Sequence, residues 1–303
     1  MPKVTVAICA YNAQMHIEET IISVLNQTFQ DFELLIIDDG SQDLTGEICK
    51  KYSLIDHRIR YYYQKNAGFG DARNQCINLA NSEWIAIIDH DDVCLPNRLE
   101  LQYKASIENP NACLIFSDSE HFLNDGTIVR RQFSDFNPCY LNLQPRYALD
   151  ELLINGCFID SETAFFKKSA AVSVGGFNTQ WRYINDYDLF LKMALKYELY
   201  GIDSVLSKWR IHESQVTGKS YKISISEHIE LYQTWLLDKS ISKKSKSITK
   251  LRIFFYYIRS LRYPDMWNNI GGLWNILKNL YNMKPTTFDE YFWIIKKLSI
   301  NIK

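Results

Sequence analysis

The chain has 303 residues, of which 47% are hydrophobic and 23% are charged, a composition typical of a globular protein with a substantial buried core. This composition excludes a disordered chain, and the absence of any run of about 18 apolar residues predicts no membrane-spanning helix. The formal net charge of −1 is unevenly distributed, because residues 239–303 carry 13 Lys and Arg against 3 Asp and Glu. An acidic body is therefore followed by a basic C-terminal region.

The seven cysteines are scattered along the chain, odd in number, and never spaced as CxxC. Neither a disulfide framework nor a zinc site is therefore expected. The opening MPKVTVAICAYN passes from one lysine directly into a short apolar run and lacks the long apolar segment of a signal peptide. Together these features predict a cytoplasmic location.

Short apolar runs alternate with helix-like segments through the first 120 residues. Such alternation predicts an α/β fold, in which a mainly parallel sheet is covered by helices on both faces. The expected strands are 4–9, 32–38, 58–64, 83–89 and 112–118, and the expected helices are 16–26, 44–53, 70–80 and 96–109.

The rest of the chain is less regular. Residues 120–180 show little periodicity and include a two-glycine turn at 174–178. A helix is expected over 185–197, with acidic side chains in its first turn, and a pair of strands is expected to follow it, ending near His212. We therefore predict a domain over residues 1–219 and a helical C-terminal appendage, basic and aromatic, over residues 220–303.

Polar residues follow each of the first four predicted strands. The strand ends read CAYN, DDGS, QKNAGFGDARN and DHDD. Ligands of open α/β sheets bind beyond the carboxyl ends of the strands, where the strand order reverses. The four ends are therefore expected to form one polar, acidic crevice.

The strand end IAIIDHDD places three carboxylates within four positions. Mg²⁺ and Mn²⁺ prefer oxygen ligands, so a divalent cation would offset the repulsion between these charges. Asp91 is assigned as the direct ligand, supported by Asp89 on the same side of the extended chain. The alternative is a turn or helix-capping cluster, in which Asp is a favoured residue, and this interpretation suits Asp92.

Six segments, taken in order, resemble the family 2 glycosyltransferases, which are inverting enzymes of the GT-A fold that use nucleotide-diphosphate sugars. They are the start VTVAICAYN, NAGFGDARN, DHDD followed by LP, GGFN, NDYDLFLKMA and WRIH. The resemblance covers residues 3 to about 215. It implies a nucleotide-sugar-binding half over 1–118, an acceptor-binding and catalytic half over 119–219, and Mn²⁺ or Mg²⁺ as cofactor.

The resemblance also implies roles in donor binding. Tyr11 would lie against the base, and Asp39 would accept a hydrogen bond from a ring N–H. A carboxylate matches the N3–H of uracil or thymine and the N1–H of guanine but not adenine, which leaves a UDP-sugar favoured and GDP- and dTDP-sugars open. Arg73 would lie near the ring or the phosphates, unless it is a surface residue at a helix start. The remaining implied donor residues are Ala10, Asn12 and Asp89.

The catalytic base implied by the resemblance is Asp186, which would remove the proton from the acceptor hydroxyl. Without the family pattern, Asp186 reads equally well as an ordinary acid at a helix start. His212 resembles the family's late histidine, which reaches the metal or the diphosphate, although a histidine after a strand is more often a packing or surface residue. The chain departs from the family at Asn185, because a Glu commonly precedes the base.

The C-terminal region combines aromatic and basic residues in helix-length pieces, as in LRIFFYYIRSLRY, MWNNIGGLWNILKNLY and FDEYFWIIKKLS. Such helices are typical of contact with an anionic membrane surface, or they pack on the body or on a second subunit. The resemblance implies a glycan acceptor, possibly lipid-linked, in bacterial-type surface polysaccharide synthesis, and hence a peripheral place at the inner face of the cell membrane. Nucleic-acid binding is not expected, because the basic residues do not follow a groove-tracking face.

Two other functions fit part of this pattern. A nucleotidyltransferase-like enzyme would use a similar sheet, but no lysine-bearing, glycine-rich signature opens the chain. A non-catalytic nucleotide-sugar-binding protein would not need Asp186. A glycosyltransferase accounts for both the carboxylates after the fourth strand and those at the start of the late helix.

Overall fold

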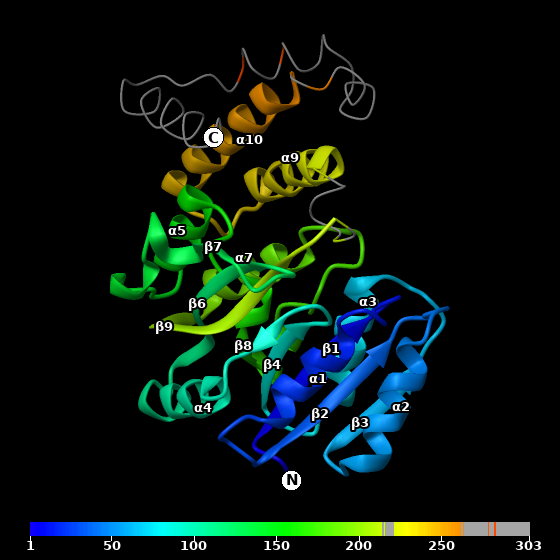
Figure 1. The fold of residues 1–303 in the computed structure, drawn as a ribbon. Coiled ribbons are helices and arrows are strands. Elements are labelled where there is room, and N and C mark those ends of the chain that lie inside the picture. The colour runs from blue at the N-terminus through cyan, green and yellow to red at the C-terminus, as the bar shows by residue number, and fades with distance from the viewer. Residues whose placement is uncertain (214, 216–220, 262, 264–277, 279–281, 283–303) are drawn as a thin grey trace. The chain divides into compact units, whose positions relative to one another are not determined.

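The computed structural model describes residues 1–213, 215, 221–261, 263, 278 and 282. The chain forms two compact units, drawn in Figure 1. The first comprises residues 1–148 and 157–213, and the second comprises residues 149–156 together with the chain from 214 onward. The first unit contains every residue that the sequence assigns to the crevice.

The first unit is built on a nine-stranded mixed sheet, whose main path runs β3-β2-β1-β4-β8-β6-β9-β5 with β7 paired to β6. In its parallel half, three strands are runs of mostly apolar residues buried on both faces, as a covered parallel sheet requires, whereas the edge strand IRYYY is partly exposed. In the register, Ala10 pairs with Asp38 and Cys9 with Asp89, so three strand ends lie at one edge. The parallel strands are β1 (Val4–Ala10), β2 (Phe32–Asp38), β3 (Ile59–Tyr63) and β4 (Trp84–Asp89).

Helices cover both faces of this half. Right-handed crossovers from β1 to β2 and from β2 to β3 place α1 and α2 on one face, where they contact each other. The crossover to β4 runs in the opposite direction, so α3 lies on the other face against β1 and β2. The helices are α1 (Ile17–Leu25), α2 (Thr45–Ile55), α3 (Phe69–Leu79) and α4 (Arg98–Glu108), close to the predicted bounds.

The remaining strands make the sheet mixed. The strand β8 runs antiparallel to both β4 and β6, whereas β9 runs parallel to β6 and antiparallel to β5. The elements are β5 (Val93–Cys94), β6 (Ala112–Leu123), β7 (Ile128–Arg131), β8 (Phe165–Lys167), α6 (Lys168–Ser173), α7 (Asn185–Lys196) and β9 (Glu198–Ile211), with 3₁₀ turns η1 (Gln132–Ser134), η2 (Pro138–Tyr140) and η3 (Ser161–Thr163).

The predicted pair of strands after α7 is wrong, because β9 is one strand of 14 residues. Its pairing with β6 shifts register between Ser117 and Asp118, where the partner changes from Ile202 to Val205. The additional residues form an irregularity in the ladder, as in a β-bulge, and continue the strand. Glycine and aspartate at this point resemble a turn in the sequence, which explains the error.

The second unit is helical in its described part. It contains most of α5 (Tyr147–Asn155), together with α9 (Tyr221–Leu237) and α10 (Lys243–Ser260). Ser245 Oγ donates to Asp150 Oδ1 at 2.6 Å, which fixes α10 to α5. Among the described residues, no helix has the length and apolarity that crossing a bilayer would require. The predicted segments MWNNIGGLWNILKNLY and FDEYFWIIKKLS lie outside the described residues, apart from isolated positions, and the boundary at residue 220 remains a prediction.

Candidate active site

The loops after β1 and β2 are tied together by Asn12. Its backbone has a positive φ of 49°, a conformation that Asn tolerates better than most residues. The Asn12 N–H donates to Ser41 Oγ at 3.0 Å, and its Oδ1 accepts from the N–H of Gln42 at 2.9 Å. The neighbouring Tyr11 is 40% exposed. The loop is therefore held by its backbone and amide, while an aromatic ring remains at the surface.

Asp39 organises the loop that leads into α3. Its N–H donates to the carbonyl of Ala10 at 2.8 Å. Its Oδ1 accepts from Gln64 Nε2 at 2.7 Å and from the N–H of Ala67 at 2.9 Å, and its Oδ2 accepts from the N–H of Gly68 at 2.8 Å. A carboxylate offers about four acceptor positions. Asp39 thus retains roughly one, on Oδ2, for a further donor.

Arg73 joins the end of β4 to the start of α7. Its guanidinium is buried, with Nη2 donating to Asp89 Oδ1 and Nη1 donating to Asn185 Oδ1, both at 2.8 Å. Nη1 also lies 4.0 Å from Asp186 Oδ2. On the other side, Ser161 Oγ donates to Asp89 Oδ2 at 2.7 Å. Arg73 therefore donates its hydrogen bonds to side chains of the protein, and its contact with the donor remains a prediction.

Asp91 and Asp92 are adjacent in sequence but play different parts. Asp91 Oδ2 lies 2.9 Å from Nε2 of His212, which follows β9. Asp92 is fully buried, and its Oδ1 accepts from the N–H of Arg210 at 2.8 Å. Arg210 Nε also donates to the carbonyl of Asp91 at 2.7 Å. The end of β9 is thus held on the acidic segment by Asp92, while Asp91 pairs with His212.

The surroundings of the two candidate carboxylates move their pKa values in opposite directions. Burial tends to raise the pKa of Asp91, but the hydrogen bond from His212 and the nearby His90 bring it below its usual value. Burial raises the pKa of Asp186, and Arg73 offsets this only in part. Asp91 therefore favours the anionic form, which suits a cation, whereas Asp186 accepts a proton more readily than an ordinary aspartate.

The side chains beside Asp91 supply part of the ligand set that a divalent cation needs. No group of three or more His, Cys, Asp or Glu side chains is arranged to hold a metal within the described part of the chain. Asp91 and His212 supply one oxygen and one nitrogen, both of which suit Mn²⁺. The pair fits a cation that takes its remaining ligands from a bound diphosphate and water, as Mg²⁺ commonly does.

Two segments that the sequence singled out separately contact each other. Asn74 Nδ2 donates to the carbonyl of Phe177 at 2.8 Å, and Asn74 Oδ1 accepts from the N–H of Phe177 at 2.9 Å. Gly176 has a φ of 67°, and a Cβ there would lie 2.6 Å from Asn74 Oδ1. The GGFN turn is therefore held on α3, immediately after Arg73, and requires glycine at this position.

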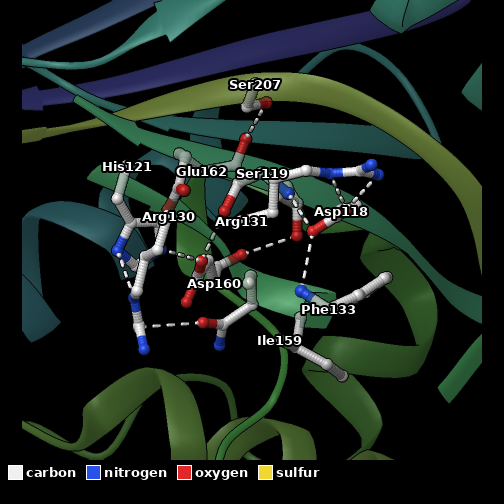
Figure 2. A network of polar contacts seen from close by, with 12 residues as sticks. Asp118, Ser119, His121, Arg130, Arg131, Phe133, Ile159, Asp160, Glu162 and Ser207 are labelled. Atoms are coloured by element: carbon white, nitrogen blue, oxygen red, sulfur yellow. Dashed lines mark hydrogen bonds and ion pairs between the residues drawn. The ribbon is translucent and has the colours of Figure 1, made fainter. Parts of the chain in front are cut away.

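A polar network around Asp160, which the sequence did not reveal, adjoins this site (Figure 2). Asp160 Oδ2 accepts from Ser119 Oγ at 2.6 Å and lies 3.0 Å from His121 Nε2, while Arg130 Nε donates to His121 Nδ1 at 3.1 Å. Since Nδ1 accepts, the proton of a neutral His121 is on Nε2 and points to Asp160. The network anchors the residue directly before Ser161, which in turn holds Asp89. His121 and Asp160 are 39 positions apart, and no local pattern links them.

The family described as Glycosyl transferase family 2 matches residues 5–174. An uncharacterized glycosyltransferase of Rickettsia typhi is 27% identical to the chain, over 97% of each protein. The putative teichuronic acid biosynthesis glycosyltransferase TuaG of Bacillus subtilis is 26% identical, over 80% of this chain and 89% of TuaG.

Two solved structures share the fold. The structure of S. aureus TarS 1–349 with UDP-GlcNAc aligns with a TM-score of 0.66 at 17% identity, over 93% of this chain and 79% of that one. The mannosyltransferase PcManGT of Pyrobaculum calidifontis, with GDP-Man and Mn²⁺, aligns with a TM-score of 0.64 at 17% identity, over 100% of this chain and 81% of that one.

Proposed function

Because the chain belongs to glycosyl transferase family 2 and has the GT-A fold of its structural neighbours, we propose that it transfers a sugar from a UDP-sugar to a hydroxyl of a glycan acceptor with inversion. The observation that carries this proposal is the arrangement at one edge of the sheet. The Asp91–His212 pair lies at one end, Asp186 lies at the other, and Arg73 with Asp89 connects the two ends. Family membership supports a transferase over the two other functions considered.

For the donor, Tyr11 supplies an exposed ring for the base, and Asp39 has an acceptor position left for a ring N–H. Uracil N3–H and guanine N1–H both fit this position. TarS binds UDP-GlcNAc and the archaeal mannosyltransferase binds GDP-Man, so both nucleotides occur among the structural neighbours. We favour a UDP-sugar and include a GDP-sugar in the test below.

Asp91 and His212 are the residues that would hold Mn²⁺ or Mg²⁺. The mannosyltransferase, whose structure contains Mn²⁺, supports a divalent cation. When bound, the cation neutralises the charge that develops on the departing diphosphate. The low pKa of Asp91 keeps its carboxylate anionic and ready to bind.

Asp186 is the proposed base. The acceptor oxygen attacks the anomeric carbon on the face opposite the diphosphate, its proton passes to Asp186, and the bond from the anomeric carbon to the phosphate oxygen breaks. The N–H of Tyr187 donates to Asp186 Oδ1 at 2.7 Å and Arg73 lies on the side of Oδ2, so the carboxylate is orientated.

We propose that the acceptor is a lipid-linked glycan of a surface polysaccharide. Its support is the similarity to TuaG, whose name refers to teichuronic acid biosynthesis. We further propose that the protein is cytoplasmic and contacts the inner face of the membrane through its C-terminal region. Lys243 and Lys250 are exposed on α10 and provide positive charge for anionic lipid.

A thermal-shift panel tests the proposal. UDP-, GDP- and dTDP-sugars are added with and without Mn²⁺ to the wild type, to Asp91→Ala and to Asp186→Asn. We expect stabilisation by a UDP-sugar that depends on Mn²⁺, is lost in Asp91→Ala and is kept in Asp186→Asn. If no nucleotide sugar stabilises the wild type, the proposed function is wrong.

A further inference from the structure

Arg73 is a buried cation placed between two carboxylates that serve different parts of the site. Its Nη1 donates to Asn185 and its Nη2 to Asp89 and, at 3.4 Å, to Ser161 Oγ, whereas its Nε is buried without a hydrogen-bond partner among the described residues. An unsatisfied buried N–H costs free energy. The hydrogen bonds of its terminal nitrogens therefore set the orientation of the guanidinium. Packing of the carbon chain alone does not require this orientation.

The partner at the start of α7 is a neutral amide. Asn185 Oδ1 faces Arg73, while Nδ2 points to the carbonyls of Trp181 and Arg182, each at 3.4 Å. These contacts fix which end of the amide faces the guanidinium. Because Asn185 carries no charge, it anchors Arg73 without neutralising it. The positive charge remains available to Asp89 and to Asp186.

We propose that Arg73, together with the neutral Asn185, positions the base relative to the metal-binding segment. Arg73 holds Asp89 and the first turn of α7, so that Asp186 meets the acceptor as a carboxylate. This inference rests on the proposed function of Asp186. In this role Arg73 acts through the side chains that it contacts, Asp89, Asn185 and Asp186.

The chemistry of arginine accounts for its use here. The guanidinium is charged at every relevant pH and presents donors in a rigid fork, so one side chain can serve two acceptors in fixed directions. Ser161 holds Asp89 from its other oxygen, and the ring of Phe177 lies 5.5 Å from the guanidinium carbon. Lysine would supply the charge without the second directed hydrogen bond, which makes Arg73→Lys an informative variant.

The experiment measures UDP release from UDP-glucose, UDP-galactose and UDP-GlcNAc with Mn²⁺ and no acceptor. In this reaction water replaces the acceptor hydroxyl, its oxygen bonds to the anomeric carbon, its proton passes to Asp186, and UDP leaves. The rate is followed from pH 4.5 to 8 with the sugar that gives the largest signal. A thermal shift with UDP and Mn²⁺ reports donor binding for each variant.

For Arg73→Met we expect kcat to fall by about 100-fold and the acidic limb of the pH profile to move up by about one pH unit, because a cation near a carboxylate favours its ionised form. Binding of UDP with Mn²⁺ should change less than threefold. Arg73→Lys should restore the position of the limb but only part of kcat. The isosteric Asn185→Asp should also move the limb upward, because its charge competes for Arg73.

The matched control is Arg60→Met, which removes an arginine–carboxylate pair to Glu33 at 2.7 Å from the same sheet. It should leave kcat and the limb unchanged. The inference is overturned if the acidic limb of Arg73→Met lies at the wild-type pH. If Arg73→Met does not fold, the same result in Asn185→Asp overturns it. Full activity in Asp186→Asn would instead contradict the proposed base, so the two failures are distinguishable.

Discussion

The two ends of the proposed site, a metal end at Asp91 and a base end at Asp186, hold their carboxylates in different ways. At the metal end, Asp91 is paired with His212, a side chain that can itself bind a cation. At the base end, Asp186 lies beside Arg73, which cannot bind a cation and does not lose its charge. A cation bound at the proposed metal end would replace the hydrogen bond between Asp91 and His212, whereas the proposed base would keep its contact with Arg73.

The largest expected effect is at the base end. Asp186→Asn removes the proton acceptor but keeps the size of the side chain, so transfer should fall by about 10³-fold. Binding of the nucleotide with Mn²⁺ should stay within threefold, because the metal end is untouched. UDP release and thermal shifts measure the two quantities separately. Equal losses in both would show that the two ends are not independent.

A large effect of another kind is expected at the metal end. Asp91→Asn removes the anionic oxygen, and the Mn²⁺ concentration needed for half-maximal thermal stabilisation by UDP should rise by about 100-fold or more. A Mn²⁺ titration at fixed UDP measures this. If the Mn²⁺ titration is unchanged, Asp91 is not a ligand of the metal.

The next effect is at His212. His212→Asn should raise the required Mn²⁺ concentration by about tenfold, since one of the two protein ligands is lost while the carboxylate remains. The matched control is His16→Asn, because the ring of His16 lies 5.0 Å from that of His212 but outside the Asp91 pair. Similar titrations for the two variants would argue against a ligand role for His212.

The smallest effect is a separation in pH. Because the pKa of Asp186 is raised and that of Asp91 is lowered, Asp186 is protonated first as the pH falls. At saturating Mn²⁺, which favours the unprotonated forms of Asp91 and His212, transfer should therefore fail at a higher pH than nucleotide binding does. Rates and thermal shifts over the same acidic buffers test this order. If transfer and nucleotide binding are lost at the same pH, the expected difference between the pKa values at the two ends is wrong.

The sequence predicted the parallel half of the sheet well because its elements are long and uniform. Three of these strands, β1, β2 and β4, are runs of mostly apolar residues buried on both faces, and each of β1 to β4 is separated from the next by a helix of 9 to 11 residues. The short strands β5 and β8, of two and three residues, are too brief to show any period. The glycine and aspartate at the irregularity in β9 are typical of a turn, so one strand was predicted as two.

For the site, residues next to strand ends were predictable and their partners were not. Asp91 and Asp186 stand out as carboxylates at the ends of elements. The contact between Arg73 and Asn185 spans 112 positions, and it depends on where α7 is placed against the sheet. The same holds for Asp92 and Arg210, which are 118 positions apart. Local patterns identify the chemistry of a position, whereas tertiary packing decides which groups meet.

The clamp between Asn74 and the GGFN turn bears on the engineering of chimaeric enzymes. Residues 119–219, the proposed acceptor-binding half, are the part that an exchange of acceptor specificity would replace. Their GGFN turn, however, is moulded to Asn74, with Gly176 leaving no room for a side chain. Arg73 and Asn74 should therefore be exchanged together with this half. A junction that separates them from the turn would leave the new acceptor side misaligned with an intact donor side.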